Sequence, residues 1–591
     1  YVLSKQTFRR YINARLDSVE ELITELTPEA DASRALLKRL PDIERLLSRV
    51  HSMASAHRDS EHPESRAIMY EETKYSIRKV KDFLCVLEGL ETADRLPEVF
   101  ASATIKSALL RKCILPLAEG GQFPDMTAVI SFFRKAFDAK QAKQDGVIKP
   151  KAGVDPVFDK AKEHIKGIEM DLHRHLTQQQ KQLRCTEINY CKSGKDRYQL
   201  EVPDHILAKH GQPRDYEIRS KKKGWKRFWT PFIKDKLLEL AEAEQQLGDA
   251  QRDQMRRLFA KFDEHSELWA AAVRSLAHLD ALLSLMEVSS QPGFSRPHLY
   301  DDVGVSPFIR LKDARHPCLA NTYQGGECIP NNCALGKAPQ DLIDASPDAP
   351  SMLLLTGPNM GGKSTLLRQT CLVAILAQVG CFVPAEVAHL TPFDRIFTRV
   401  GATDRILAGQ STFFVELSET ANILHHATNR SLVILDELGR GTSTFDGTAI
   451  AHAVVHNLVK SAKCLAMFAT HYHSLVEDWG HHSKVALGHM SCLVEGDGEE
   501  QRVTFLYKLA PGPCPKSFGI NVARLARLPQ AVITAAQHKS HEFEIALSHQ
   551  HASDSKGRLA LSLLRLLEET DDGPPGGGDD LHKLWLEAQT C

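Results

Sequence analysis

The sequence has no cysteine pattern that would build a disulfide framework or a zinc site. Its 591 residues include 13 cysteines, which are scattered, odd in number and without a C-x-x-C pair. Cys191, Cys328 and Cys333 lack the neighbours that zinc ligation needs. Because disulfide frameworks belong to small secreted domains, we expect reduced thiols in a cytosolic or nuclear protein.

The sequence also has almost no net charge, no long apolar run and no internal repeat. The formal net charge is -1, so any nucleic-acid site must be a local basic patch. No apolar run approaches membrane-spanning length and we find no signal-peptide pattern in the given sequence, so we expect no membrane partner. With 42% hydrophobic and 25% charged residues, the chain is typical of a soluble globular protein with several domains. A helical pattern is already present at Tyr1, so we expect a fragment of a longer protein.

The most specific motif is a glycine-rich loop between a buried strand and a helix. Residues 352–356 are predicted to form a buried strand, 357–364 fit the G-x-x-x-x-G-K-[ST] phosphate-loop pattern, and a helix is predicted from about 363 to 378. Its glycines let the backbone approach a polyphosphate at the positive end of that helix. Lys363 would reach the β- and γ-phosphates, and Ser364 would bind Mg²⁺. The alternative, a chance glycine turn, is disfavoured by the strand and helix around it. The predicted nucleotide-binding residues are Gly357, Pro358, Asn359, Met360, Gly361, Gly362, Lys363, Ser364 and Thr365.

A second apolar strand, over residues 431–435, leads into two carboxylates. Asp436 would hold the same Mg²⁺ as Ser364, and Glu437 would orient or deprotonate the attacking water. Acidic residues are common at strand ends, so the pair is specific only because a phosphate loop precedes it. Alternating strands and helices from about 308 to 540 predict an α/β domain.

Two further residues each have a structural and a functional interpretation. His471 follows another apolar strand, 465–469, at the end where ligands of such sheets gather, which favours a γ-phosphate sensor over a packed or surface histidine. Ser411 opens a helix, and its local sequence favours a simple N-cap. The alternative is a serine offered to the phosphate of a second subunit. The segment 439–447 is too rich in glycine for a plain connection.

The first half is predicted to be mainly helical, with one small β-rich insertion. Residues 1–183 carry apolar side chains three and four apart, except for a Lys-, Gly- and Pro-rich connection over 139–156. Strands are predicted over 186–190 and 197–202, and long helices return over 231–286. An outgoing helix, a small sheet and a returning helix would make a lever with a tip.

The tip carries a basic stretch. Residues 219–229 contain six basic side chains interleaved with three aromatic ones. Such a run is often only a solvated face, but on a protruding tip it predicts contact with nucleic-acid phosphates without sequence readout. The predicted nucleic-acid-binding residues are Lys221, Lys222, Lys223, Lys226 and Arg227.

These motifs occur in the order found in the MutS family of DNA mismatch-repair ATPases, which the sequence closely resembles. The resemblance reaches to about residue 545 and rests on residues 13–17, 40–49, 356–365, 394–401, 411–419, 436–447 and 468–472. Residues 65–73 are most similar to one eukaryotic branch, the sixth MutS homologues, which pair with the second homologue.

The resemblance implies a multidomain fold, α and α/β, with an ABC-type P-loop ATPase domain. The implied domains are a helical core with an outgoing lever (1–183), a small β-rich clamp (184–230), a returning lever (231–300), the ATPase domain (301–545), and C-terminal helices with a flexible tail (546–591). It also implies composite sites, in which Ser411 serves the partner's ATP. The residues implied to serve the chain's own ATP and Mg²⁺ are Lys363, Ser364, Asp436, Glu437 and His471.

Two departures from the family pattern matter. The family often has an aromatic residue before Ile-Pro-Asn that stacks on adenine, whereas Cys328 precedes residues 329–331 here, which puts that contact in question. The family's mismatch wedge is a Phe-x-Glu motif in an N-terminal domain that we do not find in this chain. Phe262 and Glu264 have that spacing, but they lie in a predicted lever helix, so we interpret them as packing residues.

The resulting hypothesis is a nuclear, ATP-driven clamp on double-stranded DNA with mismatches, acting as a heterodimer with the second MutS homologue. The alternative is an ATPase-like scaffold subunit without useful hydrolysis. The intact Lys363, Asp436 and Glu437 argue against that alternative.

Overall fold

The computed structural model describes residues 5–54, 72–193, 196–300, 304–319, 328–339, 349–401, 411–495, 502–514, 518–543 and 545. Internal contacts divide the chain into two units. The helical unit comprises residues 17–287, and the α/β unit comprises residues 1–16 and 288–591. The division falls within α1 (Lys5–Thr24) and α13 (Ser266–Ser289).

The helical unit begins as a bundle around a cluster of aromatic rings. Phe83 lies 5.1 Å from Phe259 and 5.2 Å from Phe262, and Phe262 stacks on Trp269 at 4.8 Å. Phe262 is 1% exposed, which confirms that it is a packing residue. The other helices of the bundle are α2 (Thr27–Leu37), α3 (Ile43–Ala54), α4 (Glu72–Asp94), α5 (Leu96–Val99), α6 (Ala108–Ile114), η3 (Leu117–Glu119), α7 (Thr127–Ala136), α8 (Ala139–Asp145) and α12 (Gln254–Asp263).

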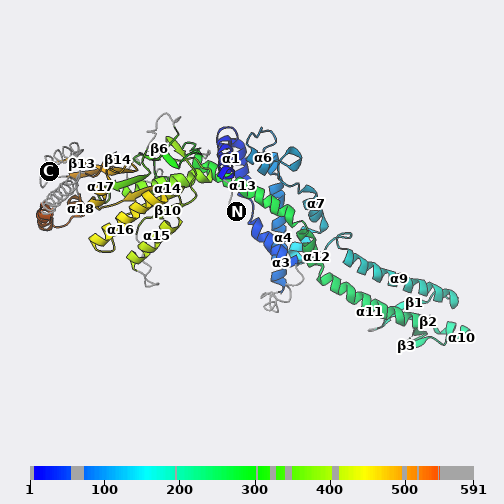
Figure 1. The fold of residues 1–591 in the computed structure, drawn as a ribbon. Coiled ribbons are helices and arrows are strands. Elements are labelled where there is room, and N and C mark those ends of the chain that lie inside the picture. Colours follow the sequence, from blue (N-terminus) through cyan, green and yellow to red (C-terminus); the bar gives the residue numbers. More distant parts are fainter. Residues whose placement is uncertain are drawn as a thin grey trace, which may run out of the picture. The chain divides into compact units, whose positions relative to one another are not determined.

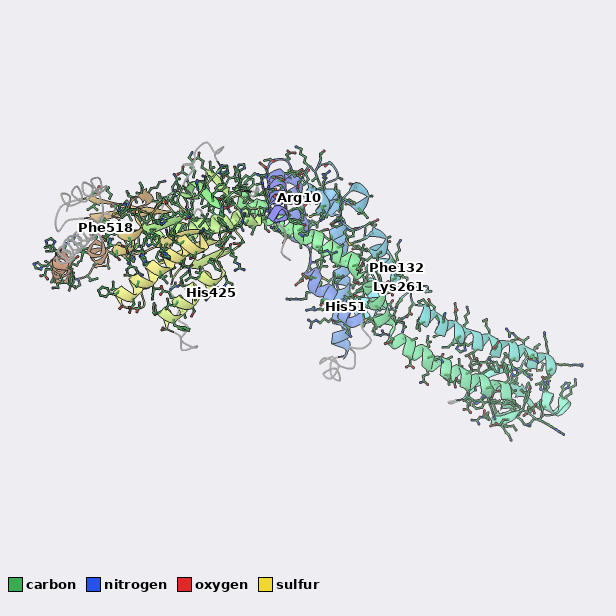
Figure 2. All side chains as sticks on the ribbon, in the orientation of Figure 1. Arg10, His51, Phe132, Lys261, His425 and Phe518 are labelled. Atoms are coloured by element: carbon green, nitrogen blue, oxygen red, sulfur yellow. The ribbon has the colours of Figure 1, made fainter. Side chains whose placement is uncertain are left out.

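Polar contacts on the bundle surface join α12 to its neighbours. The ammonium of Lys261 lies 4.5 Å from the centre of the Phe132 ring, so a cation–π contact links α12 to α7 (Figure 2). His51 Nδ1 lies 2.8 Å from Asp263 Oδ2, which joins α3 to α12. By length and composition α13 could cross a membrane, but Trp269, Leu279 and Leu283 of this helix are buried in the protein.

The predicted connection over 139–156 is wrong in its first part, because α8 occupies Ala139–Asp145. The Asp138 side chain accepts hydrogen bonds from the backbone N–H groups of Lys140 and Gln141, which caps the helix start. Gly146, with φ +69°, ends it in the left-handed conformation that glycine adopts most easily. Cap residues at both ends therefore define a helix that the overall composition of the segment conceals.

The lever and tip form a second part of the helical unit. Helices α9 (Pro156–Gln182) and α11 (Pro231–Arg252) run side by side, with a small sheet at their far end (Figure 1). The sheet has the order β1-β2-β4-β3 and is antiparallel. Its elements are β1 (Asn189–Ser193), β2 (Asp196–Pro203), α10 (Asp204–His210), β3 (Glu217–Lys222) and β4 (Trp225–Trp229).

The first strand of this sheet begins later than the sequence predicts, at Asn189 instead of residue 186. The chain leaves α9 through Arg184, whose φ is +47°, and the Cys185 N–H still donates to the Gln180 carbonyl. The residues directly after α9 therefore belong to its C-terminal turn and do not pair as a strand. Phe228 and Leu200, both fully buried, then pack the sheet onto the two helices.

The described residues of the α/β unit form two sheets. The larger has the order β10-β11-β12-β8-β13-β14, and all its pairs are parallel except β13 with β14. The smaller has the order β5-β9-β6-β7. The elements are β5 (His298–Leu299), β6 (Phe308–Ala314), β7 (Asn331–Gly336), β8 (Met352–Thr356), α14 (Lys363–Val379), β9 (Val387–Leu390), β10 (Ile396–Arg399), α15 (Thr412–His426), β11 (Leu432–Asp436), α16 (Thr444–His456), η5 (Asn457–Ala462), β12 (Leu465–Ala469), α17 (His473–Trp479), β13 (Val485–Glu495), β14 (Arg502–Pro511) and α18 (Gly519–Leu525).

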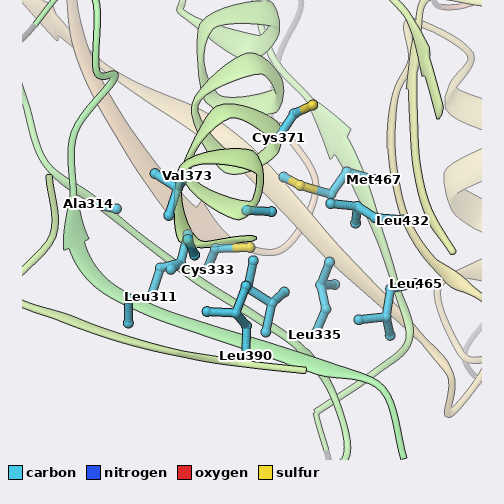
Figure 3. Close-up of a cluster of buried hydrophobic side chains, with 14 of the residues drawn as sticks. Leu311, Ala314, Cys333, Leu335, Cys371, Val373, Leu390, Leu432, Leu465 and Met467 are labelled. Atoms are coloured by element: carbon cyan, nitrogen blue, oxygen red, sulfur yellow. The ribbon is translucent and has the colours of Figure 1, made fainter. Parts of the chain in front are cut away.

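Side chains of both sheets meet α14 in one hydrophobic core (Figure 3). Leu311 and Leu390 come from the small sheet, Leu432 and Met467 from the large one, and Val373 from α14. A separate core on the other face of the large sheet packs against α16 and α17. Strands buried on both faces need uninterrupted apolar runs, and for this reason β8, β11 and β12 could be recognised in the sequence.

Predictions for the C-terminal tail, residues 546–591, lie outside the described residues. These include helices over 557–569 and 581–588 and a flexible linker over 571–578. Residues 65–71 of the stretch that indicates the eukaryotic branch also lie outside them.

Candidate functional site

The phosphate loop connects β8 to α14 through glycines with positive φ angles. Every residue of β8 is buried. Gly357 has φ +129°, and a Cβ there would lie 3.2 Å from the backbone nitrogen of Met490. Gly362 has φ +96° directly before α14 begins at Lys363. The loop therefore needs glycine for its conformation and is placed at the positive end of a helix.

Lys363 is the first residue of α14, and its side chain is 3% exposed. Its ammonium donates to the carbonyl oxygens of Gly357, at 2.8 Å, and Pro358, at 3.2 Å. Burial lowers the pKa of Lys363, and this effect outweighs the opposing carboxylates of Glu437 and Asp436. The cation is thus held among backbone carbonyls, where a phosphate would provide full charge compensation.

Ser364 and Asp436 form a pair suited to Mg²⁺. The Ser364 hydroxyl donates to Asp436 Oδ2 at 2.6 Å. The other oxygen, Oδ1, is buried and has no hydrogen-bond partner among the described residues. Burial raises the pKa of Asp436, against the hydrogen bond from Ser364. A hydroxyl and a carboxylate oxygen are ligands that Mg²⁺ accepts together with phosphates and water, so these residues fit the ion.

Glu437 follows Asp436 at the strand end in a left-handed conformation, with φ +55°. Its Oε1 lies 2.5 Å from His471 Nε2, and its Oε2 lies 2.5 Å from an Arg440 guanidinium nitrogen. Burial raises the pKa of Glu437, but His471, Arg440 and Lys363 together lower it below its ordinary value. The carboxylate is therefore ionised at neutral pH, as a group that orients or deprotonates water must be.

The base side of the site includes residues that the sequence analysis missed. A cavity of about 540 Å³ lies beside the loop, lined by Cys328 and Ile329 on one side and by Phe505 and Tyr507 of β14 on another. The Tyr507 ring would lie 3.3 Å from a Cβ at Gly362. Tyr507 of β14 could therefore supply an aromatic contact for a purine, whereas Cys328, which stands where the family often has an aromatic residue, could not. No motif in the sequence marked this strand.

Asn331 connects the two walls of this cavity. Its side-chain amide donates to the Tyr507 carbonyl at 2.9 Å, and its oxygen accepts from the Leu509 N–H at 2.7 Å. The side chain is buried, so both hydrogen bonds are shielded from water. Asn331 thus holds β14 against β7 and fixes the place of Tyr507 beside the loop.

Ser411 lies outside the cluster formed by the other predicted residues. It is the N-cap of α15, and its hydroxyl accepts from the Phe414 N–H at 3.2 Å. This confirms the structural interpretation of the residue. Ser411 is also exposed, so a ligand of a second subunit could reach the same helix end.

The predicted basic residues gather at the β3–β4 hairpin, but they differ in environment. Lys221, Lys222 and Lys223 are exposed, and Lys226 is half-buried. Arg227 is 17% exposed, and its guanidinium donates to Glu201 at 2.9 and 3.0 Å. Lys221, Lys222 and Lys223 thus present their charge to solvent, whereas the charge of Arg227 is largely compensated within the sheet.

Two family models match this chain: MutS domain III over residues 7–285 and MutS domain V over residues 353–544. The chain belongs to the MutS family. Domain V is the ATPase domain of MutS proteins. Its match includes the phosphate loop, Ser411, Asp436, Glu437 and His471. The MutS domain III match includes the bundle, the lever and the basic hairpin. The predicted fold class, multidomain α and α/β with a P-loop ATPase domain, is confirmed.

Several MutS relatives of this chain are longer than the chain itself. The chain is 46% identical to DNA mismatch repair protein Msh6 of Gallus gallus over 592 residues, covering 97% of this chain and 42% of the relative. It is 46% identical to that of Homo sapiens over 542 residues, covering 90% and 40%. Identity to Msh3 of Homo sapiens is 32% over 550 residues, covering 90% and 45%. The chain thus resembles Msh6 and spans less than half the length of these curated relatives.

Proposed function

We propose that this chain is the ATP-hydrolysing part of a DNA mismatch-repair subunit that uses Mg²⁺. The observation that carries the proposal is the joint placement of Ser364, Asp436 and Glu437 around a phosphate loop. Residues 357–365 would hold the phosphates, with Lys363 at the β- and γ-positions. Ser364 and Asp436 would hold Mg²⁺, which neutralises charge on the phosphates. Glu437, oriented by His471, would align the attacking water.

The proposed partners are double-stranded DNA with mismatches and the second MutS homologue. The similarity to proteins named DNA mismatch repair protein Msh6 supports the first of these. The exposed Ser411 helix end supports a composite site completed by a second subunit. The basic hairpin supports contact with DNA phosphates. Since its substrate would be chromosomal DNA, we propose a nuclear location.

The test is ATP turnover by wild type and Glu437→Gln, with and without the second MutS homologue and mismatched DNA. We expect Glu437→Gln to lower turnover by about 10²- to 10³-fold, since it removes a group that acts mainly in the transition state. Binding of a fluorescent ATP analogue should be retained. Glu477→Gln, at an exposed position on α17, is the control and should match wild type.

The same measurement separates this function from a scaffold without hydrolysis. Turnover that depends on Glu437 and rises with the partner supports the composite site. Turnover that survives Glu437→Gln would come from a contaminant, and the chain would then be better explained as a scaffold subunit without hydrolysis. The compact arrangement of Lys363, Asp436 and Glu437 favours the enzyme.

A further inference from the structure

Helix α15 has Ser411 as its N-cap and carries a buried carboxylate slightly more than one turn further on. Glu416 is 4% exposed. Its Oε1 accepts from the Gly439 N–H at 2.8 Å, and its Oε2 lies 3.4 Å from the guanidinium of Arg399. Arg399, on β10, also lies 3.4 Å from Glu419. Arg399 thus compensates the negative charge of Glu416 at one carboxylate oxygen, while the other oxygen accepts a hydrogen bond from Gly439, two residues after Glu437.

Gly439 is held from several directions. Its carbonyl accepts from the Tyr472 hydroxyl at 2.9 Å. Its φ is +97°, and a Cβ there would lie 2.8 Å from the carbonyl oxygen of Gly447. Two residues earlier, the Glu437 N–H donates to the Ala469 carbonyl at 2.9 Å. Residues in unfavourable backbone conformations persist only where the surroundings fix them, and this is the situation of Glu437.

We propose that Glu416 is a positioning residue that couples the Ser411 end of α15 to Glu437. The inference rests on the proposed function, in which Ser411 meets the ATP of a second subunit. A continuous helix moves as one body, so a shift of its N-terminus on that contact carries Glu416 with it. The Glu416–Gly439 hydrogen bond transmits the shift to the segment that follows Glu437. Occupancy of one subunit's site thereby adjusts the catalytic geometry of the other.

The first test compares two glutamates on the same helix. Glu416 and Glu419 both pair with Arg399, but only Glu416 has a hydrogen bond to Gly439. In the heterodimer with mismatched DNA, Glu416→Ala should lower kcat by about 10- to 100-fold, with KM within about twofold, because misplacement of a catalytic group acts on the chemical step. Glu416→Gln should keep most of the activity, since its amide oxygen can accept the same hydrogen bond. Glu419→Ala should match wild type.

The second test asks whether Glu416 links the two sites. The partner's catalytic glutamate is replaced by glutamine, so that turnover reports this chain alone. Ser411→Ala should then lower turnover several-fold in a chain that has Glu416, and should have no further effect in Glu416→Ala. Independent, multiplying effects would overturn the coupling.

The outcomes distinguish this proposal from the one before it. Absence of Glu437-dependent hydrolysis in wild type would refute the proposed function itself. Wild-type hydrolysis with Glu416→Ala equal to Glu419→Ala would overturn only the role of Glu416. If Glu416→Ala folds poorly, the size-matched Glu416→Met replaces it in both tests, with the same expected results.

Discussion

The nucleotide site and the basic hairpin hold their charged side chains in opposite ways. In the site, the Lys363 and Glu437 side chains are 3% and 16% exposed, and each touches several charged or polar groups. In the hairpin, the Lys222 side chain is 60% exposed and lies 3.9 Å from one carboxylate. Buried charges interact strongly, whereas exposed ones are screened by water and salt.

This difference predicts how each region fails. A buried network loses its function when one member is removed, because the remaining groups are left uncompensated. An exposed patch loses affinity in small steps that add up, one phosphate contact at a time. Under the proposed function, the same chain would combine a cooperative chemical site with an additive contact surface.

The largest expected effect is at the metal pair. Asp436→Asn removes the buried charge that Ser364 and Mg²⁺ would share, and we expect turnover to fall by about 10²- to 10³-fold. Turnover measured across a Mg²⁺ titration checks this, and high Mg²⁺ should not restore wild-type rates. DNA binding without nucleotide should be unchanged. Turnover that recovers fully would show that Asp436 does not hold the ion.

The hairpin should respond more weakly and in proportion to the charges removed. Replacing Lys221, Lys222 and Lys223 by alanine should lower DNA affinity by about tenfold at low salt and reduce the salt slope by about one, as for the loss of one full phosphate contact. Fluorescence anisotropy over a range of salt concentrations measures both. The matched control replaces three exposed lysines of α9, and DNA affinity should then stay within about twofold of wild type. The control lysines are Lys160, Lys162 and Lys166.

Equal losses from the two sets of lysines would contradict the hairpin as the DNA contact. In that case the affinity would come from overall charge and not from the tip. Loss of DNA-independent ATP turnover in the hairpin variant would show a folding defect instead. The expected result leaves that turnover unchanged.

A smaller effect follows from the burial of Lys363. Its pKa is lowered from 10.5 by burial, so the native state binds this proton less tightly than the unfolded chain does. Native stability should therefore rise with pH between the lowered pKa and 10.5. Lys363→Met should abolish that rise and stabilise the nucleotide-free α/β unit by about 1 kcal/mol near neutral pH.

The measurement is thermal unfolding at several pH values, following the transition that ATP raises in wild type. Lys363→Met should show no shift with ATP. Its higher stability without nucleotide would show that this site trades stability for binding. A lower stability at neutral pH would mean that the hydrogen bonds to Gly357 and Pro358 outweigh the cost of burying the charge.

Sequence patterns predicted the parts of the fold that depend on local signals. Residues 352–355 of β8, 432–435 of β11 and all of β12 are apolar because both faces of these strands are covered, and the motif residues at the strand ends could be assigned to one edge of a sheet. Helix α8 was missed because its caps, Asp138 and Gly146, lie in a segment of loop-like composition. Strand β1 was placed too early because the end of α9 cannot be read from residue types.

The candidate site divides in the same way. Lys363, Ser364, Asp436 and Glu437 follow from spacing, since each lies within a short motif. Tyr507 and Glu416 could not be found, because they reach the site only through the pairing of β14 with β13 and the packing of α15. Contacts between segments far apart in the chain leave no local pattern. Likewise, the sequence could not show that the Lys222 side chain is exposed and the Arg227 side chain mostly buried, because this depends on how the strands pair.

The smallest expected effect concerns Glu201, which would compete with DNA for two basic side chains. It accepts from Arg227 and lies 3.9 Å from Lys222. Glu201→Gln should tighten DNA binding by about threefold at low salt (~0.6 kcal/mol), in the range of partly exposed ion pairs. The gain should vanish at high salt, where such pairs are screened.

The double variant Glu201→Gln with Arg227→Ala is the control for this prediction. If the gain comes from releasing Arg227, the double variant should lose most of it. Weaker binding by Glu201→Gln would reverse the interpretation, since the carboxylate would then hold Arg227 in the geometry that DNA requires. In that case even the hairpin would contain a small cooperative unit, and the contrast with the nucleotide site would be one of degree.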